Sequence, residues 1–268
     1  MTSSAPPQRE IVVIELQLTI SEERISLRIP VPKGPATAED MLPILRALTK
    51  LATDMATEKV ADQGKSVSCR AGCAMCCRQI VPIPKFEAQR LARLVDSMPE
   101  PRRTTIRSRF HDATQRLRDA GLYDALTSSH NESETPVLEL SSQYLRLMIA
   151  CPFLEDESCS IYDERPITCR EYQVTSPPAL CANPSENDLE PLPLAIKPST
   201  ASMMLEIDQP QEGGSKTSWI ALTRALDWAE SSPPTEPAAS GLELLEKLMK
   251  ALTGQSASAD QQPGTDAS

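Results

Sequence analysis

Apolar and polar residues alternate along residues 11–31, which predicts two β-strands. A period of two places every second side chain on the same face, so the pattern indicates a β-hairpin with one buried side. A short polar stretch, 21–24, forms the expected turn, and Pro30, Pro32 and Pro35 are expected to end the hairpin. The apolar positions are Ile14, Leu16, Leu18, Ile20, Ile25, Leu27, Ile29 and Val31.

From residue 40 the apolar spacing changes to three and four, which predicts helices. Asp40 can cap a first helix that ends near Gly64, and Ile83-Pro84 opens a second that Pro99 stops. A third helix is expected over 102–120. Their apolar stripes are Met41, Leu45, Leu48, Ala52 and Met55; Leu91, Leu94, Val95 and Met98; and Ile106, Phe110, Ala113 and Leu117.

The second half of the chain is less regular. Tyr144, Leu145 and Met148 suggest a helix leading into Cys151, and 151–181 contains many turn-forming residues. Residues 231–237 resemble a linker, and Ser240 with Glu243 has the spacing of a capping box before an amphipathic helix. Two further apolar stripes indicate helices: Trp219, Leu222, Leu226 and Ala229; and Leu242, Leu245, Leu248, Met249 and Leu252.

These elements predict a mainly α protein with a small N-terminal β-hairpin, of the α+β class, and a loop-rich metal-binding lobe. The expected segments are a disordered terminus (1–9), the hairpin with a helix (10–63), a cysteine domain (64–182), a Pro-rich segment with a helix (183–230), and a linker, helix and disordered tail (231–268). The final helix could dock on the core of the chain or on a protein partner.

Composition excludes few functions, but it limits the expected partners and cellular location of the protein. The net charge of −10 does not favour nucleic-acid binding, which depends on Lys and Arg neutralising phosphates. Residues 78–118 carry ten Lys and Arg against four Asp and Glu, which is typical of a solvated helix face. No secretory signal or membrane-spanning stretch is apparent, so we expect a cytoplasmic protein without a membrane partner.

Eight cysteines dominate the chemistry of the sequence, and they fall into two groups separated by residues 78–150. Thiols stay reduced in the cytosol, so clustered cysteines there point to metal or redox chemistry and not to disulfides. We expect one metal site, or two adjacent sites, built from both groups. The cysteines are Cys69, Cys73, Cys76 and Cys77 in the first group, and Cys151, Cys159, Cys169 and Cys181 in the second.

Thiolates are the soft ligands that zinc and iron–sulfur clusters prefer. The spacing C-x3-C-x2-C brings three sulfurs together on a loop that Gly72 allows to turn tightly. Because adjacent side chains diverge, Cys76 and Cys77 can serve different ions. Four arginines near the cysteines could offset the thiolate charge: Arg70, Arg78, Arg165 and Arg170.

Three fixed elements make the cysteine region recognisable: C-x3-C-x2-C-C from Cys69, C-P-F-L from Cys151, and C-x-I-Y-x-x-R-P-x-x-C-R-x-Y from Cys159. Over residues 69–172 the chain resembles the YkgJ-type cysteine-cluster family, described as a domain that chelates zinc or iron. The resemblance implies that the seven cysteines from Cys69 to Cys169 bind metal. Cys181 lies beyond the aligned pattern.

Other interpretations of the cysteines remain open. Their first spacing is also that of radical S-adenosylmethionine enzymes, which hold a [4Fe–4S] cluster, but the helical pattern and the nine glycines do not suit that fold. A thiol-redox C-x-x-C lacks the βαβ context of a thioredoxin. Metal-free structural cysteines are the remaining alternative. Further candidates are His111, His130, Glu87 and Glu171 as ligands, and Tyr162 and Tyr172 as packing residues.

Three functions follow as hypotheses. The protein could bind zinc or iron without catalysis, with the metal joining loops that bury too little core. It could be an iron–sulfur enzyme, such as a protein lysine methylase, because flagellin lysine N-methylase resembles it by motif. It could be an adaptor that uses the final helix, which deletion of residues 231–268 would test.

Overall fold

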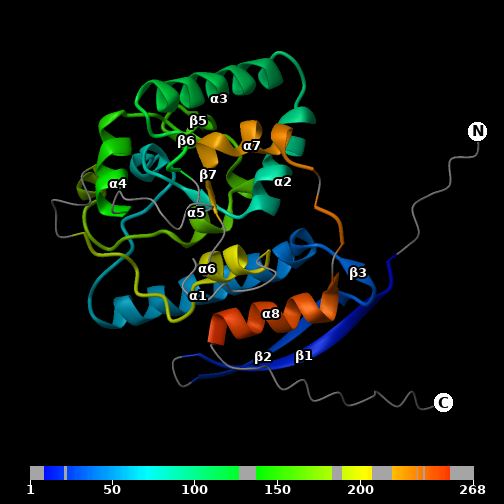
Figure 1. Cartoon of the computed structure of the whole chain (residues 1–268). Coiled ribbons are helices and arrows are strands. Elements are labelled where there is room, and N and C mark those ends of the chain that lie inside the picture. Colours follow the sequence, from blue (N-terminus) through cyan, green and yellow to red (C-terminus); the bar gives the residue numbers. More distant parts are fainter. Residues whose placement is uncertain are drawn as a thin grey trace, which may run out of the picture.

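A computed structural model describes residues 9–20, 23–126, 137–182, 189–206, 219–233, 235–237 and 239–253. Over these residues the protein is mainly helical with an N-terminal antiparallel hairpin, which confirms the predicted fold class (Figure 1). The predicted disorder at 1–8 and 254–268, and His130, lie outside the described residues. The predicted division into segments stays a prediction.

The helices and strands have the following bounds. The helices are α1 (Leu42–Asp62), α2 (Lys85–Asp96), α3 (Arg102–Asp119), α4 (Val137–Arg146), α5 (Ile167–Glu171), α6 (Pro198–Met204), α7 (Ala225–Ser231) and α8 (Gly241–Thr253). The strands are β1 (Ile11–Ile20), β2 (Glu23–Pro32), β3 (Pro35–Ala36), β4 (Pro82–Ile83), β5 (Leu154–Glu155), β6 (Ser158–Cys159), β7 (Ile220–Ala221) and β8 (Ala239–Ser240).

The hairpin of β1 and β2 has the predicted buried face. Leu16, Leu18 and Ile20 are buried, and the residues between them are exposed. The hairpin ends among the predicted prolines: Pro30 pairs with Val13, and β2 continues to Pro32. Proline lacks an N–H group and is therefore tolerated in an edge strand, where no further strand needs that donor.

Helix α1 begins later than predicted, and Asp40 is not its N-cap. A 3₁₀ helix, Ala38–Met41, precedes α1. Thr37 takes the cap position of this turn, and its backbone N–H donates to Asp40 Oδ2 at 2.8 Å. Asp40 is therefore the acidic partner in a capping box, which satisfies the amide that precedes the turn.

Helix α8 docks on the chain's own core. Its apolar side packs with the hairpin and α1, and residues from all three elements form one buried cluster (Figure 1). The predicted capping box is present, because Glu243 Oε2 accepts from the backbone N–H of Ser240 at 2.7 Å. Gly241 opens the helix against β2, where an added Cβ would lie 2.2 Å from the carbonyl oxygen of Pro32.

A second core lies among α2, α3 and α7, above α1 and α8 in Figure 1. Phe110 of α3 and Phe153 meet edge to face, with ring centroids 5.3 Å apart. Strand β7 pairs with β4, so the helix predicted from Trp219 begins only at Ala225, after a 3₁₀ turn. Extended pairing of Ile220 and Ala221 therefore overrides the helical spacing of this segment.

The helix predicted to lead into Cys151 stops short of it. Helix α4 ends at Arg146, and Met148 has a φ of 48° with 59% of its surface exposed. A left-handed residue cannot continue an α-helix, so the chain turns before it reaches Cys151. Tyr144, in contrast, is buried as its place in the pattern suggests.

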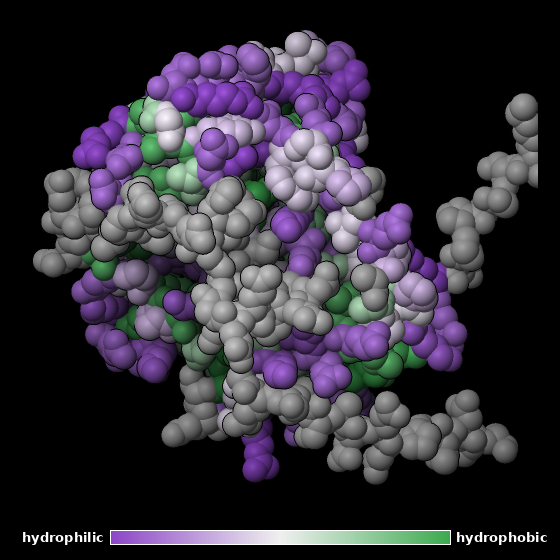
Figure 2. Space-filling model, viewed as in Figure 1, coloured by the Kyte–Doolittle hydropathy of each residue, from purple (hydrophilic) through white to green (hydrophobic). Residues whose placement is uncertain are grey.

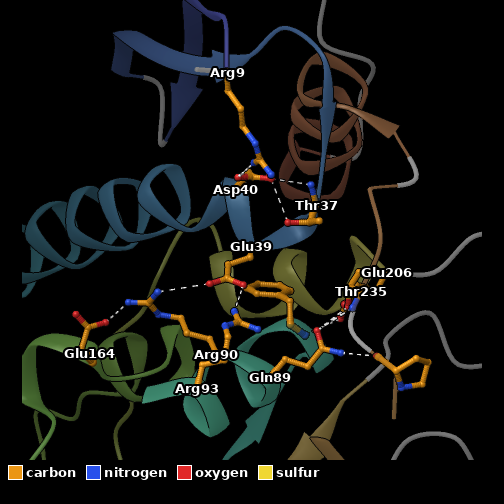
Figure 3. A network of polar contacts seen from close by, with 12 residues as sticks. Arg9, Thr37, Glu39, Asp40, Gln89, Arg90, Arg93, Glu164, Glu206 and Thr235 are labelled. Atoms are coloured by element: carbon orange, nitrogen blue, oxygen red, sulfur yellow. Dashed lines mark hydrogen bonds and ion pairs between the residues drawn. The ribbon is translucent and has the colours of Figure 1, made fainter. Parts of the chain in front are cut away.

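Ion pairs join the two cores (Figure 3). Arg90 of α2 pairs with Glu164, and its second terminal nitrogen lies 3.5 Å from Glu39. Gln89 donates to the carbonyl of Pro233 at 2.7 Å and accepts from Thr235, so the segment predicted as a linker is fixed to α2. These contacts hold α2 against both the α1 end and the segment before Cys169.

The basic stretch predicted over 78–118 is largely ion-paired along α3. Arg107 pairs with Asp96 and Glu230, Arg109 with Glu155, and hydrophilic side chains cover this side of the molecule (Figure 2). None of the described helices is long and apolar enough to span a membrane.

Candidate metal centre

The first cysteine group lies on a turn followed by one short helix. Gly72 has a φ of 82°, a left-handed conformation that glycine adopts without a Cβ clash, and Cys73 N–H donates to the carbonyl of Arg70 at 3.0 Å. The 3₁₀ helix η2 (Met75–Arg78) then carries Cys76 and Cys77. The predicted tight turn at Gly72 is thus present.

The second group reaches η2 first through Cys151. The backbone N–H of Cys151 donates to the carbonyl oxygen of Cys77 at 2.7 Å. The small β5–β6 hairpin that follows pairs Leu154 with Cys159, and both turn residues, Asp156 and Glu157, have positive φ. Two positive φ values match the turn that fits the twist of a two-residue hairpin, so this turn brings Cys159 back toward Cys151.

Helix α5 supplies Cys169, and its first turn is held by a side chain of α2 and a backbone carbonyl of β4. Glu87 Oε1 accepts from the N–H of Ile167 at 3.0 Å, and Thr168 Oγ1 donates to the carbonyl of Pro82 at 2.6 Å. The amides of a helix's first turn have no partner within the helix, so the Glu87 carboxylate satisfies one of them. These contacts fix where Cys169 lies relative to η2.

Cys181 lies on a second 3₁₀ helix, η4 (Pro178–Ala182), packed against η2. Gln79, just after η2, donates to the carbonyl of Cys181 at 2.7 Å. The loop before Cys69 is joined to the strand-like segment before η4, because Ser68 N–H donates to the carbonyl of Val174 at 2.9 Å. The fold thus brings Cys181 beside the first group, although it lies outside the recognised pattern.

All eight cysteines are free thiols; Cys181 is buried and the others are partly buried. Burial raises the pKa of most of them, to about 12 for Cys151 and about 11 for Cys181. Cys76 differs: a hydrogen bond from Cys77 lowers its pKa to about 7, and the nearby Arg165 acts in the same direction. Cys76 is therefore the thiol that ionises most readily near neutral pH.

The arginines near the cysteines take different parts. Arg165 lowers the pKa of Cys76 and Cys159, and Arg170 also favours the Cys159 thiolate. Arg78 forms a two-pronged ion pair with Glu157, 2.6 Å at its shorter contact, which ties η2 to the β5–β6 turn, and the charge of Cys77 also acts on it. Arg70 is exposed. Only part of the predicted charge compensation is therefore visible at the thiols.

Two further candidate ligands, Glu171 and His111, lie in other surroundings. Glu171 accepts from the N–H and the hydroxyl of Ser199, at 2.8 and 2.7 Å, and so caps α6. His111 is exposed on α3. Neither arrangement is that of a side chain directed at the cysteines.

The two tyrosines differ from each other. Tyr162 was predicted to pack around the site, but it is 56% exposed and stacks on Arg165, whose guanidinium carbon lies 3.7 Å from the ring centroid. Tyr172 lies beside the site as predicted. Burial raises its pKa to about 12, and the nearby thiols of Cys181, Cys76 and Cys69 act in the same direction.

Glu87 is more closely involved than the sequence indicated. A solvated helix position was the simpler expectation, yet Glu87 is only 3% exposed, and its Oε2 has no hydrogen-bond partner among the described residues. Burial raises its pKa to about 7, and its charge acts on Cys169. Gln79 was missed altogether, since a lone glutamine two residues after Cys77 carries no periodic or motif signal.

The donor chemistry fits zinc or iron, because all eight cysteines are free thiols and the segments that carry Cys151 and Cys181 both contact η2. Their arrangement is not that of a closed coordination shell. Within the described part of the chain, no three Cys, His, Asp or Glu side chains are placed as a ready metal-binding group. Binding would therefore require the thiols to close around the ion.

Comparison with known proteins gives one result. No curated protein and no solved structure matches the chain. Residues 68–190 match the model of the CxxCxxCC family, and this range includes all eight cysteines. The resemblance inferred from the sequence is thereby confirmed for this segment: over residues 68–190 the chain carries the CxxCxxCC domain, described as a putative zinc- or iron-chelating domain.

Proposed function

We propose that this protein binds zinc or iron through its cysteines, and that the bound metal stabilises the loop-rich lobe. The observation that carries the proposal is the contact of two distant cysteine segments with η2, through the Cys77–Cys151 backbone hydrogen bond and the Gln79–Cys181 hydrogen bond. The match to a chelating domain supports it. A cytoplasmic location, which keeps thiols reduced, agrees with eight free cysteines.

The lobe has a physical need for such a ligand. The elements that carry its second group are two-residue strands, a five-residue helix and 3₁₀ turns, which make few regular hydrogen bonds. Metal–thiolate bonds can add to the few regular hydrogen bonds of the lobe, because the free energy of binding becomes free energy of folding when the unfolded chain holds no site. The role that follows is structural metal binding without catalysis.

The test is elemental analysis with a visible spectrum, on full-length protein purified without oxygen. We expect zinc or iron at one or more ions per chain, and a lower melting temperature after treatment with a chelator. Colourless zinc protein would identify zinc sites, and iron with acid-labile sulfide would identify an iron–sulfur cluster. Metal-free protein that folds fully and gains no stability from either metal would overturn the proposal.

An iron–sulfur enzyme, such as a protein lysine methylase, is the second candidate, and one observation favours it. A pocket of about 320 Å³ lies between α3 and the segment 149–154, with Arg109, Asp112, Arg116 and Cys151 in its wall. A catalytic metal needs an open position beside a space for substrate, whereas a structural metal is surrounded by protein ligands. A pocket that reaches a cysteine of the cluster provides such a space.

S-adenosylmethionine binding tests this second candidate. The iron-loaded protein is expected to bind it in equilibrium dialysis, and Ala150→Trp, which narrows the pocket from an exposed position, is expected to abolish binding without lowering the iron content. If Ala150→Trp still binds S-adenosylmethionine, this pocket is not the binding site. Absence of binding by iron-loaded wild-type protein would remove this candidate and leave the metal-binding proposal intact.

A further inference from the structure

The hairpin of β1 and β2 has two outer edges, which differ in their backbone hydrogen-bonding groups. In an antiparallel pair, residues that exchange hydrogen bonds alternate with residues whose N–H and C=O groups point away from the partner strand. Pro30 and Pro32 have no N–H group, so each takes a position that points away from β1. Their partners, Val13 and Ile11, therefore direct their own N–H and C=O groups away from β2.

The outer edge of β1 is complete, whereas that of β2 is interrupted by its two prolines. By the same alternation, the outward backbone groups of β1 belong to Ile11, Val13, Glu15, Gln17 and Thr19. No described residue outside the hairpin forms a hydrogen bond with these backbone groups. Proline and lysine are common devices by which natural edge strands avoid further pairing, and β1 contains neither. Its edge is therefore open to another strand.

Strand β1 also lies on the open side of the hairpin. Helix α8 and the 3₁₀ helix Ala38–Met41 pack chiefly on β2, and the hairpin forms the lower border of the molecule in Figure 1. Ile11 and Val13 are each 52% exposed. A long, regular and largely apolar strand with a free edge is a surface to which a further strand can be added by backbone hydrogen bonds.

One antiparallel register makes β1 complementary to a second copy of itself. Residues that face each other across two strands lie on the same side of the sheet, so a register must oppose core-facing residues to core-facing residues. With the two copies of Leu16 opposite each other, all opposed residues on the core side are apolar. The opposed pairs on that side are Leu16 with Leu16, Ile14 with Leu18, and Val12 with Ile20.

The charges on the outer side of the sheet favour the same register. Glu15 is the only charged residue of β1, and it then lies opposite Gln17 of the second copy. Val13 lies opposite Thr19 on the same side. Centring the pair on Glu15 instead would bring two carboxylates together, which is destabilising. The strand that fits this edge without opposing like charges is thus β1 itself.

We propose that the protein forms a symmetric dimer through β1, in which two hairpins join as one four-stranded antiparallel sheet. The two β1 strands are adjacent at its centre, and the two β2 strands form its borders. Pro30 and Pro32 then lie on both outer edges, so the sheet closes at two copies and does not grow further. This inference concerns assembly and is independent of the proposed metal binding.

The test measures the molar mass of the full-length protein by sedimentation equilibrium over a wide range of protein concentrations. We expect a dimer for the wild type and for Ser26→Pro, and a monomer for Gln17→Pro. Gln17 and Ser26 pair across the hairpin and are both exposed, so each substitution removes one outward N–H group from one edge. Only the edge of β1 belongs to the proposed interface, which makes Ser26→Pro the matched control.

Two charge variants cover the case in which a proline variant does not fold. Gln17→Glu places a carboxylate opposite Glu15 of the second copy, whereas Gln17→Lys places an ammonium group there. Since two symmetry-related pairs change at once, the dissociation constant of the dimer should rise about tenfold for Gln17→Glu and fall about tenfold for Gln17→Lys. The same charges at Ser26 control for the effect of net charge and should change it much less.

Four results would overturn the proposal. They are a wild type that is monomeric at every concentration, a mass that grows beyond the dimer, a dimer that survives Gln17→Pro, and equal effects of the charges at Gln17 and at Ser26. A monomeric wild type would leave the β1 edge to a strand of another protein. None of these results bears on the metal content of the chain, so the proposed function is tested separately.

Discussion

At the scale of single residues, the clearest feature of the cysteine lobe besides its thiols is the buried carboxyl group of Glu87. Glu87 lies four residues before Leu91, the first apolar position of the predicted stripe, but its charge made a solvated face the simpler expectation. The structure buries it, because the first turn of α5 needs an acceptor for the Ile167 N–H and α2 is the element beside it. A sequence carries no signal for such a long-range cap, whereas the Ser240–Glu243 capping box is local and was predictable.

Glu87→Gln should flatten the pH dependence of stability. Burial raises the Glu87 pKa to about 7 from 4.5, although Ile167, Arg46, Arg170 and Arg90 all oppose the rise. The folded protein therefore holds this proton more tightly than the unfolded chain. The stability that it contributes is fully present below about pH 4.5 and is lost as the pH rises through about 7.

The shift corresponds to a contribution on the order of 3 kcal/mol. Urea unfolding of wild type and Glu87→Gln at pH 5 and pH 8 measures it, with exposed Glu246→Gln as the control. Glutamine is always neutral and keeps the oxygen that accepts from Ile167, so the difference between the two pH values should shrink only in Glu87→Gln. An unchanged difference would show that Glu87 is ionised in both states.

Gly241→Ala should destabilise the protein much more than Gly34→Ala. A Cβ at Gly241 would meet the Pro32 carbonyl oxygen at 2.2 Å and Val31 at 2.7 Å, whereas nothing lies within 4 Å of a Cβ at Gly34. We expect a loss of about 2 kcal/mol or more for Gly241→Ala, since overpacking against backbone is costly. Chemical denaturation of both variants checks this, and equal stabilities would mean that α8 can move away from β2 freely.

At the scale of elements, periodicity predicted most of the fold, and pairing between distant segments accounts for the differences. The hairpin, α1, α2, α3 and α8 follow their apolar spacing, and the predicted stripe of α3 (Ile106, Phe110, Ala113 and Leu117) is buried throughout. The segment from Trp219 failed because β4, more than a hundred residues away, pairs with Ile220 and Ala221. The cysteine set could be recognised from its motif, but the order in which its members meet η2 could not.

Helix α8 gives an element-scale prediction. Leu248 is completely buried in the cluster that α8 shares with the hairpin, while Glu246 of the same helix is exposed. Leu248→Ala should lower the free energy of unfolding by about 2–5 kcal/mol, because it leaves a cavity in a packed core. Glu246→Ala should change it by less than about 0.5 kcal/mol. Thermal unfolding of the two variants measures the difference, and similar melting temperatures would argue that α8 is not docked in solution.

At the scale of the whole molecule, the position of α8 changes how the adaptor hypothesis must be tested. Deletion of residues 231–268 would uncover apolar residues of the hairpin and α1, so loss of partner binding would not distinguish a missing contact from a damaged fold. Charge reversal on the exposed face, Glu246→Lys with Lys250→Glu, is the better variant. If α8 binds a protein partner, this pair should weaken binding and leave the melting temperature unchanged.

The docking of α8 also has a consequence for the protein as it leaves the ribosome. Residues 68–190, which contain every cysteine, leave the ribosome before α8 is made. Helix α8, which helps to bury the apolar face of the hairpin, is translated after them. The nascent chain can therefore meet metal while its first strands still lack their cover. Every thiol is thus available to metal before α8 can cover the hairpin, although the hairpin is translated first.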